Sequence, residues 1–101
     1  MGMLKFEVAH SLPQDEARRR VAQLLDYWSA KYGVKATWSG DRAHVSGKAM
    51  GLSFQADLEV AGARVGGEAT DPGFLLRERA RRYLTLKFAS YLAPPAAPEE
   101  G

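Results

Sequence analysis

The sequence contains no cysteine, only two histidines and no long hydrophobic run. Without cysteine the chain can form neither a disulfide nor a thiolate metal cluster, which fits a reducing compartment. A membrane-spanning helix needs about 18 or more consecutive apolar residues, and no run approaches this length. The opening residues, MGMLKFEVAH, also lack the apolar centre of a signal peptide. We therefore expect a cytoplasmic protein without transmembrane insertion.

Signatures of catalysis and of cofactor binding are also missing. His10 and His44 form neither an HExxH spacing nor a pair on one helix face, so the sequence predicts no metal site. An acid such as Asp41 or Asp71 could orient His10 as a base, but no activated nucleophile completes a mechanism. The glycines in GKAMG and VGGEA match neither a phosphate-binding nor a dinucleotide-binding loop. We expect neither enzyme activity nor a cofactor.

The charge is small overall but unevenly placed. A formal net charge of +2 does not by itself indicate a nucleic-acid-binding protein. Between Gly73 and Leu92, however, five basic residues accompany one acidic residue. Arginines at positions 18–20 could extend this basic region, but acidic neighbours reduce its net charge, and no aromatic platform for base stacking is predicted. We therefore do not expect nucleic acid as a partner.

The first third of the chain changes from a strand pattern to a helix pattern. Residues 4–8, LKFEV, alternate between apolar and polar side chains, which predicts a half-buried strand. Apolar residues then recur at helical spacing from Ala17 to Tyr32, which predicts a first helix that ends at Gly33. The pair Ser11 and Gln14 resembles a capping box at the start of this helix.

Four further strand-like segments follow, separated by short turns that contain glycine. They are residues 35–39, 42–48, 51–60 and 63–69. The third alternates strictly between apolar and polar residues, so one face of its sheet should be packed and the other exposed to water. Asp71 as N-cap and Pro72 at the first position then predict a second helix that extends to Leu92.

The predicted element order is β-α-β-β-β-β-α. This order indicates a two-layer α+β fold in which two helices lie on one face of a five-stranded antiparallel sheet. The outline resembles a reduced helix-grip fold, in which a curved sheet wraps around the C-terminal helix. At 101 residues the chain has room for one domain, which we place at residues 1–92. Residues 93–101 are rich in Pro, Ala and Glu, so we expect a disordered tail.

The predicted core combines side chains from the strands and from both helices. In the strand at residues 35–39, Trp38 and Ala36 are expected to face inward and to meet the first helix near Trp28. At about 100° per residue, Leu84 and Phe88 fall on the core-facing side of the second helix.

The second helix also carries charged residues beside its apolar face and leucines on the opposite face. Arg77 and Lys87 lie within or beside the apolar arc, where they either extend their charged ends to water or anchor the mouth of a groove. The opposite face holds Leu75, Arg79, Arg82 and Leu86. This set is either ordinary surface, the contact of a homodimer, or a basic and apolar strip that contacts an interface.

Two stretches resemble a family of small bacterial proteins, the polyhydroxyalkanoic acid system proteins, also called polyhydroxyalkanoate granule region proteins. They are HSLPQDEARRRV, residues 10–21, and TWSGDRAHVSGKAMG, residues 37–51. The matching residues include His10, Trp38, Gly40 and Asp41, and the likeness covers nearly all of residues 4–92. The resemblance implies a role in storage-polyester metabolism or at polyester granules, and it carries over no catalytic residues.

The sequence supports two functional hypotheses of different kinds. The first is a non-enzymatic accessory protein of the polyhydroxyalkanoate system that binds the granule surface or a granule-associated protein. The alternative is a soluble binder of a small apolar or acyl ligand, held between the sheet and the C-terminal helix. The alternative requires a cavity, which the large side chains of the interior could instead fill.

Overall fold

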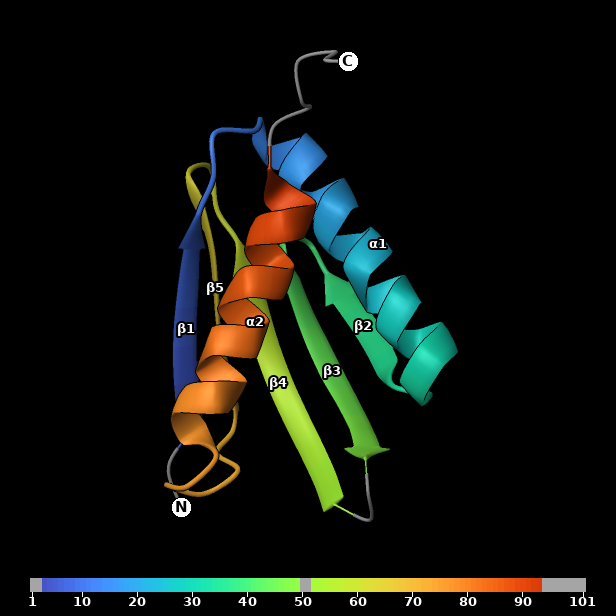
Figure 1. Cartoon of the computed structure of the whole chain (residues 1–101). Coiled ribbons are helices and arrows are strands. Elements are labelled where there is room, and N and C mark those ends of the chain that lie inside the picture. Colours follow the sequence, from blue (N-terminus) through green and yellow to red (C-terminus); the bar gives the residue numbers. More distant parts are fainter. Residues whose placement is uncertain (1–2, 50–51, 94–101) are drawn as a thin grey trace, which may run out of the picture.

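A computed structural model describes residues 3–49 and 52–93 of the chain (Figure 1). The elements are β1 (Met3–Ala9), α1 (Gln14–Tyr32), β2 (Lys35–Ser39), β3 (Arg42–Ala49), β4 (Leu52–Val60), β5 (Arg64–Thr70) and α2 (Arg77–Leu92). The strands form one antiparallel sheet, and both helices lie on the same face of it (Figure 1). The predicted α+β fold and element order are confirmed, whereas most of the predicted tail, residues 94–101, lies outside the described residues.

The sheet is a meander of β2 to β5 that β1 extends on one side, in the order β1-β5-β4-β3-β2. β1 pairs with β5 along its whole length, from Met3 opposite Thr70 to Ala9 opposite Arg64. β2 is short and pairs only with residues 42–46 of β3. The last residues of β3 therefore extend beyond the edge strand.

Alternating side chains place one face of the sheet under the helices. On β1 the even-numbered residues Leu4, Phe6 and Val8 are buried and their neighbours are exposed, as the sequence predicts. The buried residues of α1 are Ala17, Val21, Leu24 and Leu25. α1 ends at Gly33 in the left-handed conformation, with a φ of 74°, so its predicted C-terminus is also confirmed.

The start of α2 differs from the prediction. The first helical residue is Arg77 and not Pro72, and Asp71 is not an N-cap. The Asp71 carboxylate instead accepts a hydrogen bond from the backbone N–H of Gly73 and pairs with Arg77, each at 2.8 Å. Gly73 has a φ of 104°, which favours glycine, so the chain turns before the helix begins. Leu75 consequently lies in this turn and not on the helix.

The start of α1 differs as well. Pro13 is the N-cap residue and no side chain caps the helix, so the predicted capping box of Ser11 and Gln14 does not form. The Gln14 side-chain amide instead donates to Asp41 Oδ2 at 2.8 Å and to the carbonyl of Val60 at 3.0 Å. A tertiary contact has replaced the local one.

Trp38 and Ala36 of β2 pair with the buried residues Ala43 and Val45 of β3, which agrees with the inward orientation predicted for them. Trp38 is half-buried and packs against the core, but Ala36 is exposed. Because β2 is the edge strand, the helices do not cover its whole inner face. Trp38 contacts the first half of α1 through Arg18, whereas Trp28 packs against α2, so the two tryptophans do not meet as predicted.

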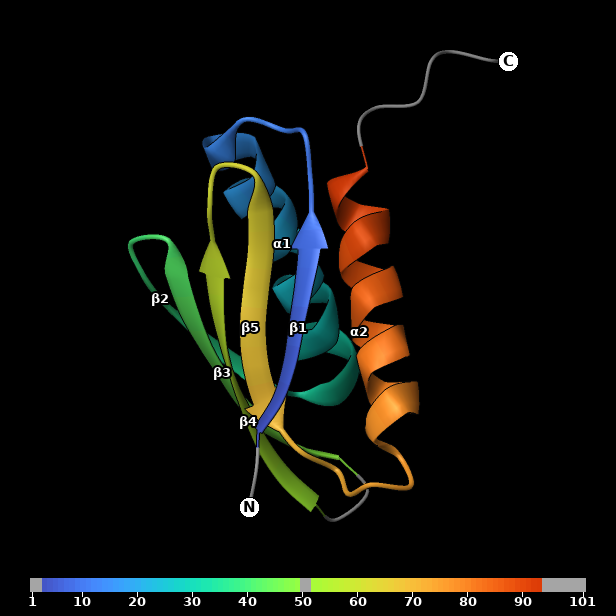
Figure 2. The ribbon, with the colours of Figure 1, turned by 90° about the vertical axis from the view of Figure 1, so that its left-hand side faces the viewer.

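α2 runs beside β1 and then meets α1 (Figure 1, Figure 2). Phe88, which is 1% exposed, anchors it, because the ring lies 5.2 Å from that of Phe6 and 5.8 Å from that of Trp28. Leu84 is half-buried beside this aromatic cluster. The N-terminal half of α2 diverges from the C-terminal half of α1, and within residues 3–49 and 52–93 no helix crosses the ends of β3 and β4 between them (Figure 1).

Candidate functional site

Residues that carry the family resemblance gather where the start of α1 meets the turns of the sheet. The backbone N–H of His10 donates to Ala63 O at 2.9 Å, and its Nε2 lies 3.1 Å from Ala61 O. Its Nδ1 accepts a hydrogen bond from the backbone N–H of Leu12 at 3.1 Å. Nε2 therefore carries the proton of the neutral ring and donates to Ala61. His10 thus ties the chain before α1 to the β4–β5 turn.

A second set of contacts ties α1 to the β2–β3 turn. Arg18 donates from Nε to the carbonyl of Gly40 at 2.9 Å, and its guanidinium lies 4.1 Å above the ring of Trp38. Gly40 has a φ of 62°, which favours glycine in this turn. Asp41 binds Gln14 with its carboxylate and accepts a hydrogen bond from Val60 N–H at 2.9 Å with its carbonyl. We call the residues His10, Gln14, Arg18, Trp38, Gly40 and Asp41 the polar clamp.

The end of α2 is held at the same place. Arg20 donates from Nη1 to the carbonyls of Tyr91 at 3.0 Å and Ala93 at 3.1 Å. Glu16 orients Arg20 through a contact of 2.8 Å with its Nε. Hydrogen bonds from Arg19 and Arg20 hold the pKa of Glu16 below its usual value, so its carboxylate is ionised at neutral pH. This end of the molecule is joined by directional polar contacts.

An apolar groove lies at the opposite end, between the sheet and α2. Its volume is about 770 Å³, within the range of about 300–1,000 Å³ typical of ligand pockets. The strands supply its floor, chiefly Val45, Phe54, Ala56, Leu58 and Ala69. α2 supplies Ala80, Leu84 and Phe88 to one wall, and Trp28 and Tyr32 of α1 complete the enclosure. The cavity that the ligand-binding alternative requires is therefore present.

The polar groups that line the groove come from both layers. Where α1 faces α2, the indole N–H of Trp28 donates to the hydroxyl of Tyr83 at 3.3 Å, and their stacked rings are 6.4 Å apart. From the sheet, Lys48 and Thr70 line the groove, and both are exposed. The Thr70 hydroxyl is bound to the backbone of Gln55. Lys48 has no hydrogen-bond or ion-pair partner within residues 3–49 and 52–93.

Beside the groove, the turn into α2 exposes three consecutive large apolar side chains. Phe74 is 78% exposed, Leu75 81% and Leu76 48%. We call these three residues the apolar turn. The predicted strip included Leu75 but not Phe74, because the predicted helix began at Pro72 and these residues were therefore assigned to helix faces. The triplet of Asp, Pro and Gly at positions 71–73 is also a turn signal and could have revealed the difference.

The remaining residues of the predicted strip lie together on α2. Arg79, Arg82 and Leu86 are exposed, and at about 100° per residue they fall within an arc of about 60°. We call them the outer stripe. None of its residues and none of the apolar turn lines the groove.

The predicted groove anchors Arg77 and Lys87 do not line the groove either. Arg77 pairs with Asp71, and Lys87 Nζ lies 5.2 Å from the centre of the Tyr27 ring. Lys48 lines the groove, although strand alternation assigns its side chain to the water-exposed face, so the sequence did not predict it there. β2 begins at Lys35 opposite Ser46 and leaves the edge of β3 beside Lys48 uncovered, so Lys48 lies at an open edge of the sheet.

The sequence profile of a family described as "Putative polyhydroxyalkanoic acid system protein" matches residues 4–83. The chain belongs to this family. No curated protein and no solved structure matches it. The match confirms the resemblance and associates the chain with the polyhydroxyalkanoate system. It spans the polar clamp, all of the sheet except Met3, and the first part of α2.

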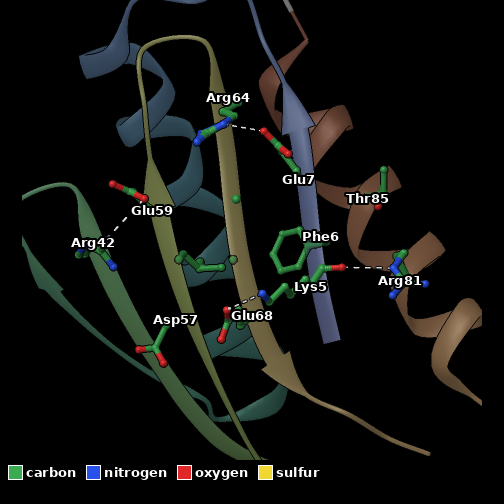
Figure 3. Close-up of a pocket in the computed structure, with 13 residues that line it drawn as sticks. Lys5, Phe6, Glu7, Arg42, Asp57, Glu59, Arg64, Glu68, Arg81 and Thr85 are labelled. Atoms are coloured by element: carbon green, nitrogen blue, oxygen red, sulfur yellow. Dashed lines mark hydrogen bonds and ion pairs between the residues drawn. The ribbon is translucent and has the colours of Figure 1, made fainter. Parts of the chain in front are cut away.

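On the other face of the sheet, this polyhydroxyalkanoic acid system protein has a polar hollow of about 780 Å³ (Figure 3). Charged side chains oppose one another across it, with Arg64 2.6 Å from Glu7, Arg42 3.6 Å from Glu59 and Lys5 3.7 Å from Glu68. His44 is exposed beside it, with Nδ1 2.8 Å from Asp57 Oδ1. The paired charges leave no strong field of one sign for an ionic ligand.

No helix within residues 3–49 and 52–93 is long and apolar enough to cross a membrane. Within the same ranges no group of three or more His, Cys, Asp or Glu side chains has the arrangement of a metal site.

Proposed function

We propose that this protein is a non-enzymatic accessory protein of the polyhydroxyalkanoate system that binds the granule surface through the apolar turn and the outer stripe. The observation that carries the proposal is the exposure of Phe74, Leu75 and Leu76 in succession. Isolated exposed leucines are ordinary, but a contiguous exposed apolar cluster marks a contact surface. The polar clamp ties α1 to the opposite end of the sheet, so it leaves this surface accessible.

Charge on the outer stripe supports the same surface. Arg79 and Arg82 are exposed, and Leu86, which is 63% exposed, follows on the same face. Arg81 is instead directed toward the sheet, where it donates to the carbonyl of Lys5 and pairs with Glu78. An exposed surface that combines arginines with large apolar residues suits a boundary between an apolar layer and anionic groups. A granule of apolar polyester in an aqueous compartment presents such a boundary.

The histidines support an accessory role over catalysis. His10 uses both ring nitrogens in backbone hydrogen bonds, so its ring is a structural link. His44 lies on the water-exposed face beside Asp57, with no nucleophile joined to it by a hydrogen bond in the described residues. A catalytic base needs a reacting group within hydrogen-bond reach.

Co-sedimentation with isolated polyester granules tests the proposal. We expect the wild-type protein to sediment with granules and Phe74→Ser with Leu75→Ser to reduce binding at least about tenfold, because one buried Leu or Phe contributes about 1.5–3 kcal/mol. Leu86→Ser with Arg82→Glu should also weaken binding. Each exposed substitution should change the free energy of unfolding by no more than about 0.5 kcal/mol.

The control is Tyr27→Ser with Lys35→Glu, which removes an exposed aromatic residue from α1 and reverses an exposed charge on β2. This control should sediment like the wild type. Wild-type protein that stays in the supernatant would contradict granule binding. Sedimentation that is lost when the granules are first stripped of their proteins would instead indicate a granule-associated protein as the partner.

A further inference from the structure

We infer that the apolar groove binds one acyl chain that ends in a carboxylate, with the chain along the apolar lining and the carboxylate at Lys48. This site does not rest on granule binding, because the apolar turn and the outer stripe do not line the groove. The two proposals can therefore fail separately.

The size of the space is the first reason. Protein interiors are close-packed and contain few voids larger than a water molecule. A space of about 770 Å³ beside the core of a 101-residue chain is far larger than such a void. Large side chains are available nearby, yet Phe54 and Leu84 remain half-buried and do not fill it.

Small residues on facing elements explain why the space stays open. Ala56 of β4 and Ala69 of β5 are directly paired, so the floor is low at this point. Ala80 lines the groove from α2. The contact between Phe6 and Phe88 fixes the position of α2, and Trp28 with Tyr83 fixes its spacing from α1. The groove therefore has small side chains on the sheet and on α2, and contacts elsewhere hold α2 in position.

The distribution of polar groups selects the ligand class. Along the groove, the hydroxyls of Tyr83 and Thr70 are already hydrogen-bonded. A ligand with polar groups along its length would leave those groups unpaired inside, which costs free energy. An acyl chain has no such groups. Its carboxylate would instead meet Lys48, an exposed lining residue whose positive charge has no partner in the described residues.

Isothermal titration calorimetry of the full chain with dodecanoate, below its micelle concentration, tests this site. We expect saturable binding of one molecule, with a change in the fluorescence of Trp28, which lines the groove. Ala56→Leu should weaken binding about tenfold or more, since loss of 1.4 kcal/mol already corresponds to a factor of ten. Ala36→Leu adds the same volume at an exposed residue outside the groove and should bind like the wild type.

The head group is tested by charge reversal. Lys48→Glu should weaken dodecanoate binding about fivefold, as expected for an exposed ion pair, and should change dodecanol binding less than about twofold. Lys35→Glu reverses an exposed lysine that does not line the groove and should affect neither ligand. Equal weakening of both ligands by Lys48→Glu would overturn the assigned orientation.

Ala80→Leu blocks the groove from the helix side and replaces Ala56→Leu as the test if that variant does not fold. The inference is overturned if wild-type protein shows no saturable binding, or if folded groove-filling variants bind dodecanoate like the wild type. Sedimentation velocity tests a further outcome. If the wild-type protein is a dimer and Ala56→Leu is a monomer, a second copy of the chain occupies the groove, and the inference is overturned. Phe74→Ser with Leu75→Ser should leave dodecanoate affinity unchanged, which separates this result from the granule experiment.

Discussion

The polar clamp and the apolar groove occupy opposite ends of the same two layers and are built by different forces. The clamp joins α1 to two turns by hydrogen bonds between 2.8 and 3.1 Å. At the groove, α2 diverges from α1 and apolar side chains line an unfilled space. Hydrogen bonds at the clamp fix where the helices lie at that end. The groove end can therefore stay incompletely packed.

The energetic consequences of the two ends also differ. A hydrogen bond typically contributes about 0.5–1.5 kcal/mol net, and several of them act together at the clamp. Apolar surface left in water forgoes about 25 cal/mol per Å² of stabilisation. An unfilled groove is therefore a cost to folding, which a bound apolar partner would offset. Three substitutions test this contrast, in order of decreasing expected effect.

The largest effect is expected at Phe88, which connects the two ends. Phe88→Ala should lower the free energy of unfolding by about 3–5 kcal/mol, because it removes a fully buried ring and leaves a cavity. Urea denaturation followed by circular dichroism measures the change, with the exposed neighbour Ser90→Ala as control. A loss below about 1 kcal/mol would mean that α2 is held mainly by the contacts of Arg20 and not by its aromatic anchor.

An intermediate effect is expected at the clamp. His10→Ala should lower the free energy of unfolding by about 1–3 kcal/mol, because it leaves the N–H of Leu12 and the carbonyl of Ala61 without their partners. Ser11→Ala, at the exposed adjacent residue, is the control for the same measurement. Equal stabilities of the two variants would show that hydrogen bonds do not hold this end closed.

The smallest effect, of opposite sign, is expected at the groove. Ala56→Leu should raise the free energy of unfolding by about 0.5–2 kcal/mol, as cavity-filling substitutions commonly do. Val65→Leu is the matched enlargement in the closely packed core, where Val65 is fully buried, and it should cost about 1–3 kcal/mol. Thermal denaturation of both variants compares them directly. If both substitutions destabilise equally, the groove end is as closely packed as the core.

The sequence predicted the elements well wherever local pattern and burial agree. The alternation in residues 4–8 and the apolar stripe of α1 each match their observed burial. Predictions failed where a tertiary contact replaced a local one. Gln14 resembled half of a capping box, but its amide binds Asp41 and Val60, which are distant in sequence. Asp71 resembled an N-cap, but a turn at Gly73 and the pair with Arg77 use its carboxylate.

The candidate sites also differ in how far they could be predicted from the sequence. Exposed residues of the outer stripe could be identified from helical spacing, because the face opposite a buried stripe follows from the period of the helix. From the sequence, the groove could only be a hypothesis, because its volume depends on the distance between α2 and the sheet. Lys48 could not be assigned to it, because its place at the groove depends on an open sheet edge that only the pairing of β2 reveals.

By itself, then, the sequence determined the element order, the buried face of each regular element and the family, because periodicity and short motifs are local properties of the chain. Only the tertiary structure decided where α2 begins, that the clamp residues meet, that α1 and α2 diverge, and that the paired alanines Ala56 and Ala69 line the groove. These features depend on contacts between residues far apart in the chain, whose competition with local preferences is resolved only when the layers pack.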